Sequence, residues 1–109
     1  MNKQNSFKEA AENELIGKAL DEVAFVHDYV QLRFDDVVFS LYGSLEFDDG
    51  DIASPNDLVS LIGRKLAACA ASDERLRLHF EGGRCLTVSW NDLPELAQYN
   101  SPKNVFIFN

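Results

Sequence analysis

A sequence pattern that occurs twice restricts the fold of this 109-residue chain more than any other feature. The segment LIGKAL at residues 15–20 matches LIGRKL at residues 61–66. At the same spacing, YVQLRF at 29–34 matches RLRLHF at 75–80, and a further short apolar segment matches after each of them. Three matches in one order at nearly constant spacing predict an internal duplication, or two similar units that fold alike.

Each copy of the pattern is preceded by the signals that begin a helix. Ser6 followed by Glu9 fits a capping box, and Ser54 followed by Pro55 fits an N-cap and the first helical position. The glycine of each LIG sequence then suits the left-handed residue that ends a helix. The sequence therefore predicts one helix at the start of each unit.

Strand-forming segments follow both glycines. Residues 18–26 and 64–71 also have features of a helix, and we favour a strand because the glycine recurs at the same position. The runs 29–34 and 75–80 alternate apolar and polar residues, which is typical of a half-buried strand. A turn rich in acidic residues or glycine follows each run, and a second apolar run then completes a hairpin. Each unit is therefore predicted to contain an antiparallel three-stranded meander.

These elements predict a single α+β domain over residues 1–109. The first unit covers about 6–53 and the second about 54–109. Because the two units have the same elements, we expect their strands to share one core as one bent sheet or a partly closed barrel.

Three further segments lie between or after the units. Residues 43–53 are interpreted as an acidic linker, and residues 93–98 as a short helix within a second linker. The tail at 104–108 is apolar and prone to form a strand. We expect it to be a last strand, either added to a sheet of this chain or paired with another chain.

The charge of the chain is strongly negative and unevenly distributed. There are 18 acidic and 10 basic residues, and residues 15–53 contain two basic and nine acidic ones. Such a chain repels phosphate backbones and anionic membranes, so binding to nucleic acids or membranes is not expected. An acidic surface on one half instead predicts a basic partner protein. The candidate contacts are six carboxylates and two aromatic anchors that would have to be exposed: Asp35, Asp36, Glu46, Asp48, Asp49, Asp51, Tyr42 and Phe47.

The sequence contains no signature of catalysis. It has no nucleophile motif, phosphate-binding loop or calcium loop. Cys69 and Cys85, together with His27 and His79, do not have the spacing of a zinc site. We therefore predict a protein that is not an enzyme and that uses no metal ion or cofactor. The two cysteines are interpreted as buried free thiols in a cytoplasmic protein.

Two arginines stand out among the basic residues. Arg75 and Arg77 lie on one face of the second alternating run. Paired guanidinium groups can hold an anionic group. Salt bridges to the acidic half of the chain are the other interpretation.

The LIG segments and their hairpins, in residues 15–42 and 61–90, resemble small bacterial domains in which an IG start leads to such a hairpin. Some small acidic proteins of this kind resemble immunity proteins encoded beside polymorphic or contact-dependent toxins. The resemblance implies a protein that neutralises a basic toxin domain, such as a nuclease, by occluding it, and it transfers no site residue. The alternative expectation is a small bacterial module that binds a small ligand or self-assembles as a homodimer through its C-terminal strand.

Overall fold

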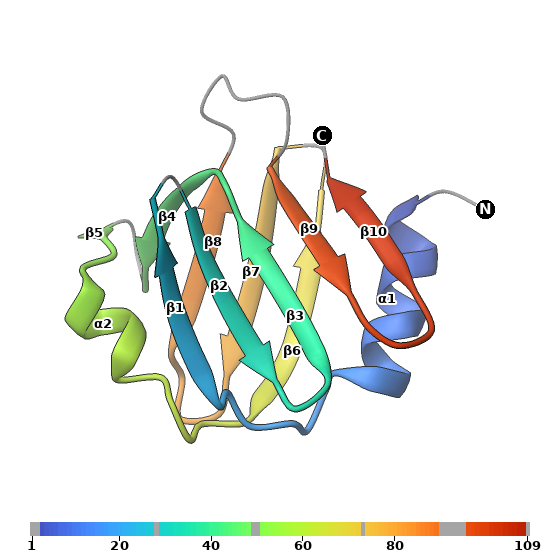
Figure 1. Ribbon diagram of the computed structural model, residues 1–109, viewed down its shortest axis with the longest axis horizontal. Helices are drawn as coiled ribbons and strands as arrows, with labels where there is room; N and C mark the ends of the chain where they lie inside the picture. The colour runs from blue at the N-terminus through green and yellow to red at the C-terminus, as the bar shows by residue number, and fades with distance from the viewer. Residues whose placement is uncertain (1–2, 28, 49–50, 73, 90–95, 109) are drawn as a thin grey trace.

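The computed structural model describes residues 3–27, 29–48, 51–72, 74–89 and 96–108, and gives no side-chain positions for residues 3–5, 51 and 52. Within these ranges, helices and antiparallel strands form an α+β fold (Figure 1). The first half contains α1 (Lys3–Glu14), β1 (Glu22–Val26), β2 (Tyr29–Phe34), β3 (Val37–Leu41), β4 (Ser44–Phe47) and β5 (Asp51–Ile52). The second half contains α2 (Pro55–Val59), β6 (Leu66–Ala71), β7 (Arg75–Phe80), β8 (Cys85–Ser89), β9 (Ala97–Asn100) and β10 (Val105–Phe108).

The described strands form two five-stranded sheets. The first has the order β1-β2-β3-β9-β10, and the second has the order β5-β4-β8-β7-β6. The predicted meanders are confirmed as β1 to β3 and β6 to β8, and the apolar tail forms β10 beside β9. Each half then sends its next strand to the other sheet, because β4 pairs with β8 and β9 pairs with β3. The prediction of one bent sheet or a partly closed barrel is therefore wrong.

Two segments that the sequence predicted as linkers contribute strands. β4 and β5 occupy part of the predicted linker 43–53, and β9 includes the end of the predicted helix 93–98, of which residues 93–95 lie outside the described ranges. In β4, Leu45 and Phe47 contribute to the core, and they alternate with the polar residues Ser44 and Glu46. This alternation spans only four residues, which is too short a run to predict a strand among Gly, Ser and Asp.

The two helices begin in different ways. Ser54 caps α2, because its Oγ accepts a hydrogen bond from the Asp57 N–H at 3.1 Å and its own N–H donates to the Asp57 carboxylate at 2.9 Å. Pro55 is the first helical residue, as predicted. α1 instead begins at Lys3, so Ser6 lies within the helix and the capping box predicted there is wrong. Lysine and glutamine precede Ser6, and both are good helix formers.

The two LIG segments lie side by side at the lower edge of the molecule in Figure 1. The Gly17 N–H donates to the Leu66 carbonyl, and the Gly63 N–H donates to the Leu20 carbonyl, both at 2.8 Å. The N–H groups of Leu20 and Leu66 donate back, each at 3.0 Å, to the residue that follows the opposite glycine. These reciprocal hydrogen bonds connect the two halves before either enters its first strand.

Alanine at Gly17 or Gly63 is expected to lower the free energy of unfolding by about 1–2 kcal/mol, measured by chemical denaturation. Both glycines have positive φ, +91° and +93°, which L-residues adopt only at a cost. A Cβ at either position would have no atom of a non-adjacent residue within 4 Å, so the cost is conformational and not steric. Asparagine at the same positions is the control and should cost less, because it tolerates positive φ better. An alanine variant as stable as the wild type would contradict this interpretation.

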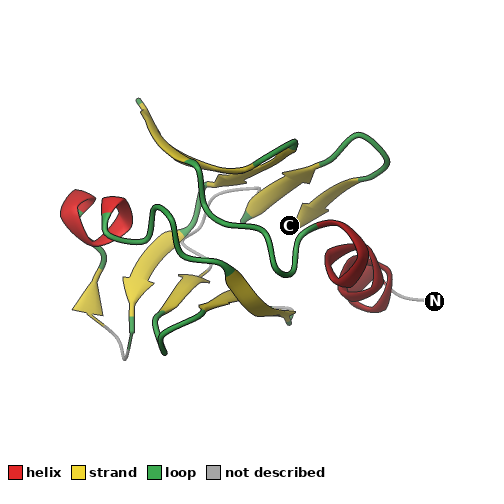
Figure 2. Cartoon of the chain, turned by 90° about the horizontal axis from the view of Figure 1, so that it is seen from below, coloured by secondary structure: helices red, strands yellow, loops and turns green. Residues whose placement is uncertain are grey.

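The hydrophobic core lies between the two sheets, and the two helices lie at its open sides (Figure 2). Phe34 of β2 and Phe80 of β7 stack across the core with their ring centroids 6.1 Å apart. α1 packs beside β6 and α2 beside β1, and each contributes a buried side chain, Phe7 and Leu58 respectively. Within the described ranges, neither helix covers the outer face of a sheet (Figure 2).

Candidate functional site

The predicted partner contacts are divided between the two sheets. The first group lies in the turn between β2 and β3 of the first sheet, and the second lies in or beside the β4–β5 hairpin of the second sheet. We call residues 46–51 the acidic hairpin. The first group comprises Asp35 and Asp36, and the second comprises Glu46, Asp48, Asp49 and Asp51. Asp49 lies outside the described residues, and Asp51 belongs to β5 without a described side chain.

The turn between β2 and β3 exposes both of its acidic residues. Asp36 accepts a hydrogen bond from Lys18 Nζ at 2.7 Å, and this contact lowers the pKa of the Asp36 carboxyl group. Asp35 has a φ of +58°, and its N–H donates to the Asp21 carboxylate at 2.6 Å. The segment before β1 therefore fixes the conformation of this turn and neutralises one of its two charges.

Asp48 anchors the acidic hairpin to β8. Its carboxylate accepts hydrogen bonds from the Cys85 N–H at 3.1 Å and from Arg84 Nη1 at 2.7 Å. The backbone hydrogen bond from Cys85 and the guanidinium group of Arg84 lower the pKa of Asp48, in that order of importance. Asp48 also has a φ of +56°, and its N–H donates to the Cys85 carbonyl at 2.7 Å. The residue therefore has a structural role in the turn besides its predicted role in partner binding.

The two predicted aromatic anchors differ in exposure. Phe47 is only 8% exposed and belongs to the core, with the Arg84 guanidinium group 5.4 Å from the centre of its ring. It therefore lacks the exposure that an anchor requires. Tyr42 is half-buried after β3, and its ring centroid lies 5.0 Å from that of Tyr29. Tyr42 remains a candidate anchor.

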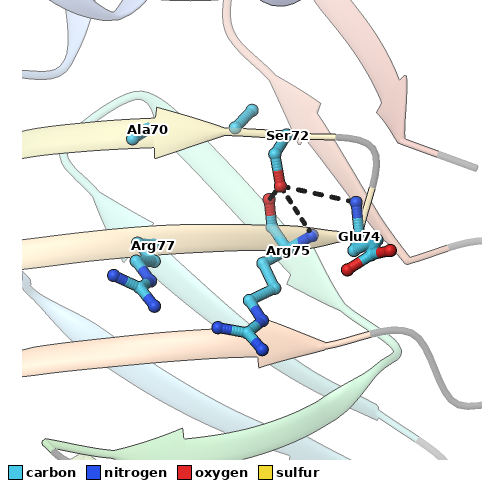
Figure 3. A pocket seen from close by; sticks show the side chains of 6 residues that line it. Ala70, Ser72, Glu74, Arg75 and Arg77 are labelled. Carbon is cyan, nitrogen blue, oxygen red and sulfur yellow. Dashed lines mark hydrogen bonds between the residues drawn. The ribbon is translucent and has the colours of Figure 1, made fainter.

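A cavity of about 460 Å³ lies at the hairpin between β6 and β7 (Figure 3). Its lining residues are Ala70, Ala71, Ser72, Glu74, Arg75 and Arg77. The Ser72 Oγ accepts a hydrogen bond from the Arg75 N–H at 3.2 Å and from the Glu74 N–H at 3.4 Å, which fixes the turn. Alternation along β7 was the sequence signal for the two arginines. The predicted meander also placed the alanines and the serine beside them, but the cavity itself was not predicted.

A partly buried polar network joins α1 to the β9–β10 hairpin. The Tyr99 hydroxyl and the Asn104 side-chain amide donate to the two carboxylate oxygens of Glu14, each at 2.7 Å. Burial and the hydrogen bond to Glu14 raise the pKa of Tyr99. Burial also acts to raise the pKa of Glu14, but hydrogen bonds from Tyr99, Ser101 and Asn104, with the charge of Lys103, lower it overall. This network positions a helix and offers no acid or base near its ordinary pKa.

Other reactive side chains do not form a site in the described part of the chain. Burial raises the pKa of the Cys69 thiol to about 11, with a smaller contribution from Glu12, so the nucleophilic thiolate is scarce at neutral pH. No three or more His, Cys, Asp or Glu residues with described positions lie close enough to hold a metal ion. No described helix is long and apolar enough to cross a membrane.

Comparisons with known proteins give no relative. No family model, curated protein or solved structure matches the chain. The roles of the acidic hairpin and of the arginine-lined cavity therefore have to follow from their geometry and charge.

Proposed function

We propose that this protein is a non-catalytic binding protein that covers a basic partner with its acidic surface, as an immunity protein covers a toxin domain. The observation that carries the proposal is the concentration of acidic residues in residues 15–53, above all in the acidic hairpin, where four of six residues are acidic. Nuclease toxins are basic because they bind phosphates, so an acidic cover would associate with them rapidly. The cytoplasm of a bacterium is the proposed location.

The anchoring of Asp48 supports this use of the hairpin. Its bonds to Arg84 and Cys85 hold the end of β4 against β8, although the hairpin lies at the edge of the sheet. A strand end that is already held in place loses less conformational entropy when a partner binds to it. We therefore assign partner contact to the other carboxylates of the hairpin, and the ordering of the turn to Asp48.

The proposal includes an internal duplication of the scaffold. Both halves run from a helix through a LIG turn into a three-stranded meander and then send a strand to the other sheet. The reciprocal bonds of Gly17 and Gly63 join matching positions of the two copies, as does the stacked pair Phe34 and Phe80. These equivalences support two copies that kept their buried positions while only the first became acidic.

Charge reversal in the acidic hairpin tests the proposed function. We expect Glu46→Lys with Asp51→Lys to slow association with the basic protein encoded in the adjacent reading frame by about tenfold or more at low salt, because steering weakens. The control is Glu9→Lys with Glu12→Lys on α1, which changes the net charge equally at two exposed positions. Association rates are measured by stopped-flow fluorescence at low and high salt, and thermal melting verifies folding. Equal slowing by both variants would contradict docking at the hairpin, and an absence of binding would contradict the function.

A second candidate function is self-assembly through β10, which the exposure of its edge favours. In the described chain β10 pairs only with β9, and Val105 and Ile107 are 60% and 37% exposed. Removal of the strand is not a suitable test, because Phe108 is buried in the core. The test is instead the molecular mass in solution of the wild type and of Val105→Lys. A wild-type dimer that is a monomer in the variant supports self-assembly. A monomeric wild type excludes it.

A further inference from the structure

We infer that the outer face of β7 carries a binding site for a small dianionic ligand, a phosphate or a dicarboxylate, held by Arg75 and Arg77. The site is the cavity of about 460 Å³ at the β6–β7 hairpin (Figure 3). It is separate from the acidic hairpin and has the opposite charge. The inference does not depend on the function proposed above.

The two guanidinium groups are placed to act on one ligand. Arg75 and Arg77 are two residues apart on one strand, so they project from the same face at a spacing of about 6–7 Å along it. Figure 3 shows both side chains extending to the same side of β7. Two guanidinium groups at this spacing can donate several hydrogen bonds to the oxygens of a single oxyanion.

Neither guanidinium group is neutralised by a residue with a described position. No ion pair or side-chain hydrogen bond joins either group to the described part of the chain. Glu74 lines the same cavity, but its carboxylate forms no ion pair within 4 Å with either arginine, and Figure 3 draws no hydrogen bond between them. In the strand register, Arg77 lies opposite Thr87, and Glu46 lies one strand beyond it. The interpretation that these arginines are satisfied by the acidic half therefore has no support among the described contacts.

The neighbours of the arginines leave room for a ligand. Ala70 of β6 lies opposite Arg77 and presents only a methyl group. Ser72 holds the turn in place through its hydrogen bonds to the backbone of residues 74 and 75. The cavity therefore combines two cationic groups that have no described ion-pair partner with a wall of small side chains.

The charge of the whole protein selects a small ligand over a polyanion. The formal net charge is −8, so an extended phosphate backbone would meet repulsion from much of the surface. A small dianion instead responds mainly to charges within about 8 Å at physiological salt, and the charged residues that line the cavity are two arginines and one glutamate, Glu74. The lining therefore keeps a net positive charge, which favours a small anion.

Nuclear magnetic resonance of the ¹⁵N-labelled full chain tests the site. Inorganic phosphate and succinate are titrated separately at slightly alkaline pH, with sodium chloride at matched ionic strength as the reference. We expect saturable shifts in the amides of residues 70–77 and in the Nε–Hε groups of Arg75 and Arg77. The tighter of the two probes identifies the source of the dianion as a phosphate or a dicarboxylate.

Matched variants make the result specific. Arg75→Gln with Arg77→Gln is expected to weaken the affinity by about tenfold or more, because charge-assisted hydrogen bonds are lost. Arg33→Gln removes an exposed arginine from the outer face of the first sheet and should leave the affinity unchanged. The proposal is overturned if neither probe gives saturable shifts, if sodium chloride gives the same shifts, or if the double variant binds as the wild type does. Tight binding of a single-stranded oligonucleotide through the same arginines, without binding of either probe, would overturn it in favour of a polyanion site.

Discussion

Replacement of Phe7 with alanine is expected to lower the free energy of unfolding by about 3–5 kcal/mol. Phe7 is 1% exposed and is the side chain through which α1 enters the core. Its ring makes edge-to-face contacts with four others, at centroid distances of 5.9 Å to Phe39, 5.4 Å to Tyr99, 5.7 Å to Phe106 and 5.0 Å to Phe108. Alanine would remove all four contacts and leave a cavity where α1 meets the first sheet.

Urea denaturation of the wild type and the variant measures this loss. A domain of this size is commonly stable by about 5–15 kcal/mol, so the expected loss is a large enough share of the total to be resolved clearly. Lys8→Ala is the control, since Lys8 is exposed on the same helix and its loss should change little. A loss below about 1 kcal/mol for Phe7→Ala would show that α1 contributes little to the core.

Replacement of Glu14 with alanine is expected to cost about 1–3 kcal/mol, because it leaves the buried Tyr99 hydroxyl and the Asn104 amide without their acceptor. Tyr99→Phe removes one of these donors and should cost less. If the network acts as a unit, the double variant will be more stable than the sum of the two single losses implies. If the loss in the double variant equals the sum of the two single losses, a direct interaction between Glu14 and Tyr99 is contradicted.

The same network predicts how stability depends on pH. The pKa of Glu14 is lowered in the folded protein. The folded state is therefore stabilised more by the ionised carboxylate, which accepts the hydrogen bonds of the network, than by the protonated form. This stabilisation is present above the ordinary pKa of a glutamate and is lost as the pH falls through the lowered pKa of Glu14. As the pH falls through this acidic range, we expect the melting temperature of Glu14→Gln to decrease less than that of the wild type. Identical pH profiles would contradict the assignment, since Asp36 and Asp48 titrate in both proteins.

Much of the fold was predictable because its meanders are local. The runs that became β2 and β7 alternate over six residues, and each is followed at once by a turn and by the apolar run that became β3 or β8, so period and turn chemistry were sufficient. The exchange of β4 and β9 between the sheets was not predictable. Each strand is only four residues long. Its partner strand is distant in the sequence, and no local sequence pattern predicts such a pairing.

The candidate site was predictable in composition but not in arrangement. The sequence identified the acidic residues, because the type of each residue gives its charge. It did not show that Arg84, 36 positions away, bonds to Asp48, nor that Phe47 lies inward while its neighbours face solvent. It also left two interpretations of Arg75 and Arg77, because the absence of a neutralising neighbour among described residues is visible only in three dimensions.

The exchange of strands between the sheets has a consequence during synthesis. When the ribosome has delivered only the first half, β3 has no partner along its second edge, because β9 has not yet been made. That strand is largely apolar, and an open apolar edge readily recruits strands from other molecules. An intermediate in which only the first meander has folded would therefore expose this edge until the β9–β10 hairpin pairs with it.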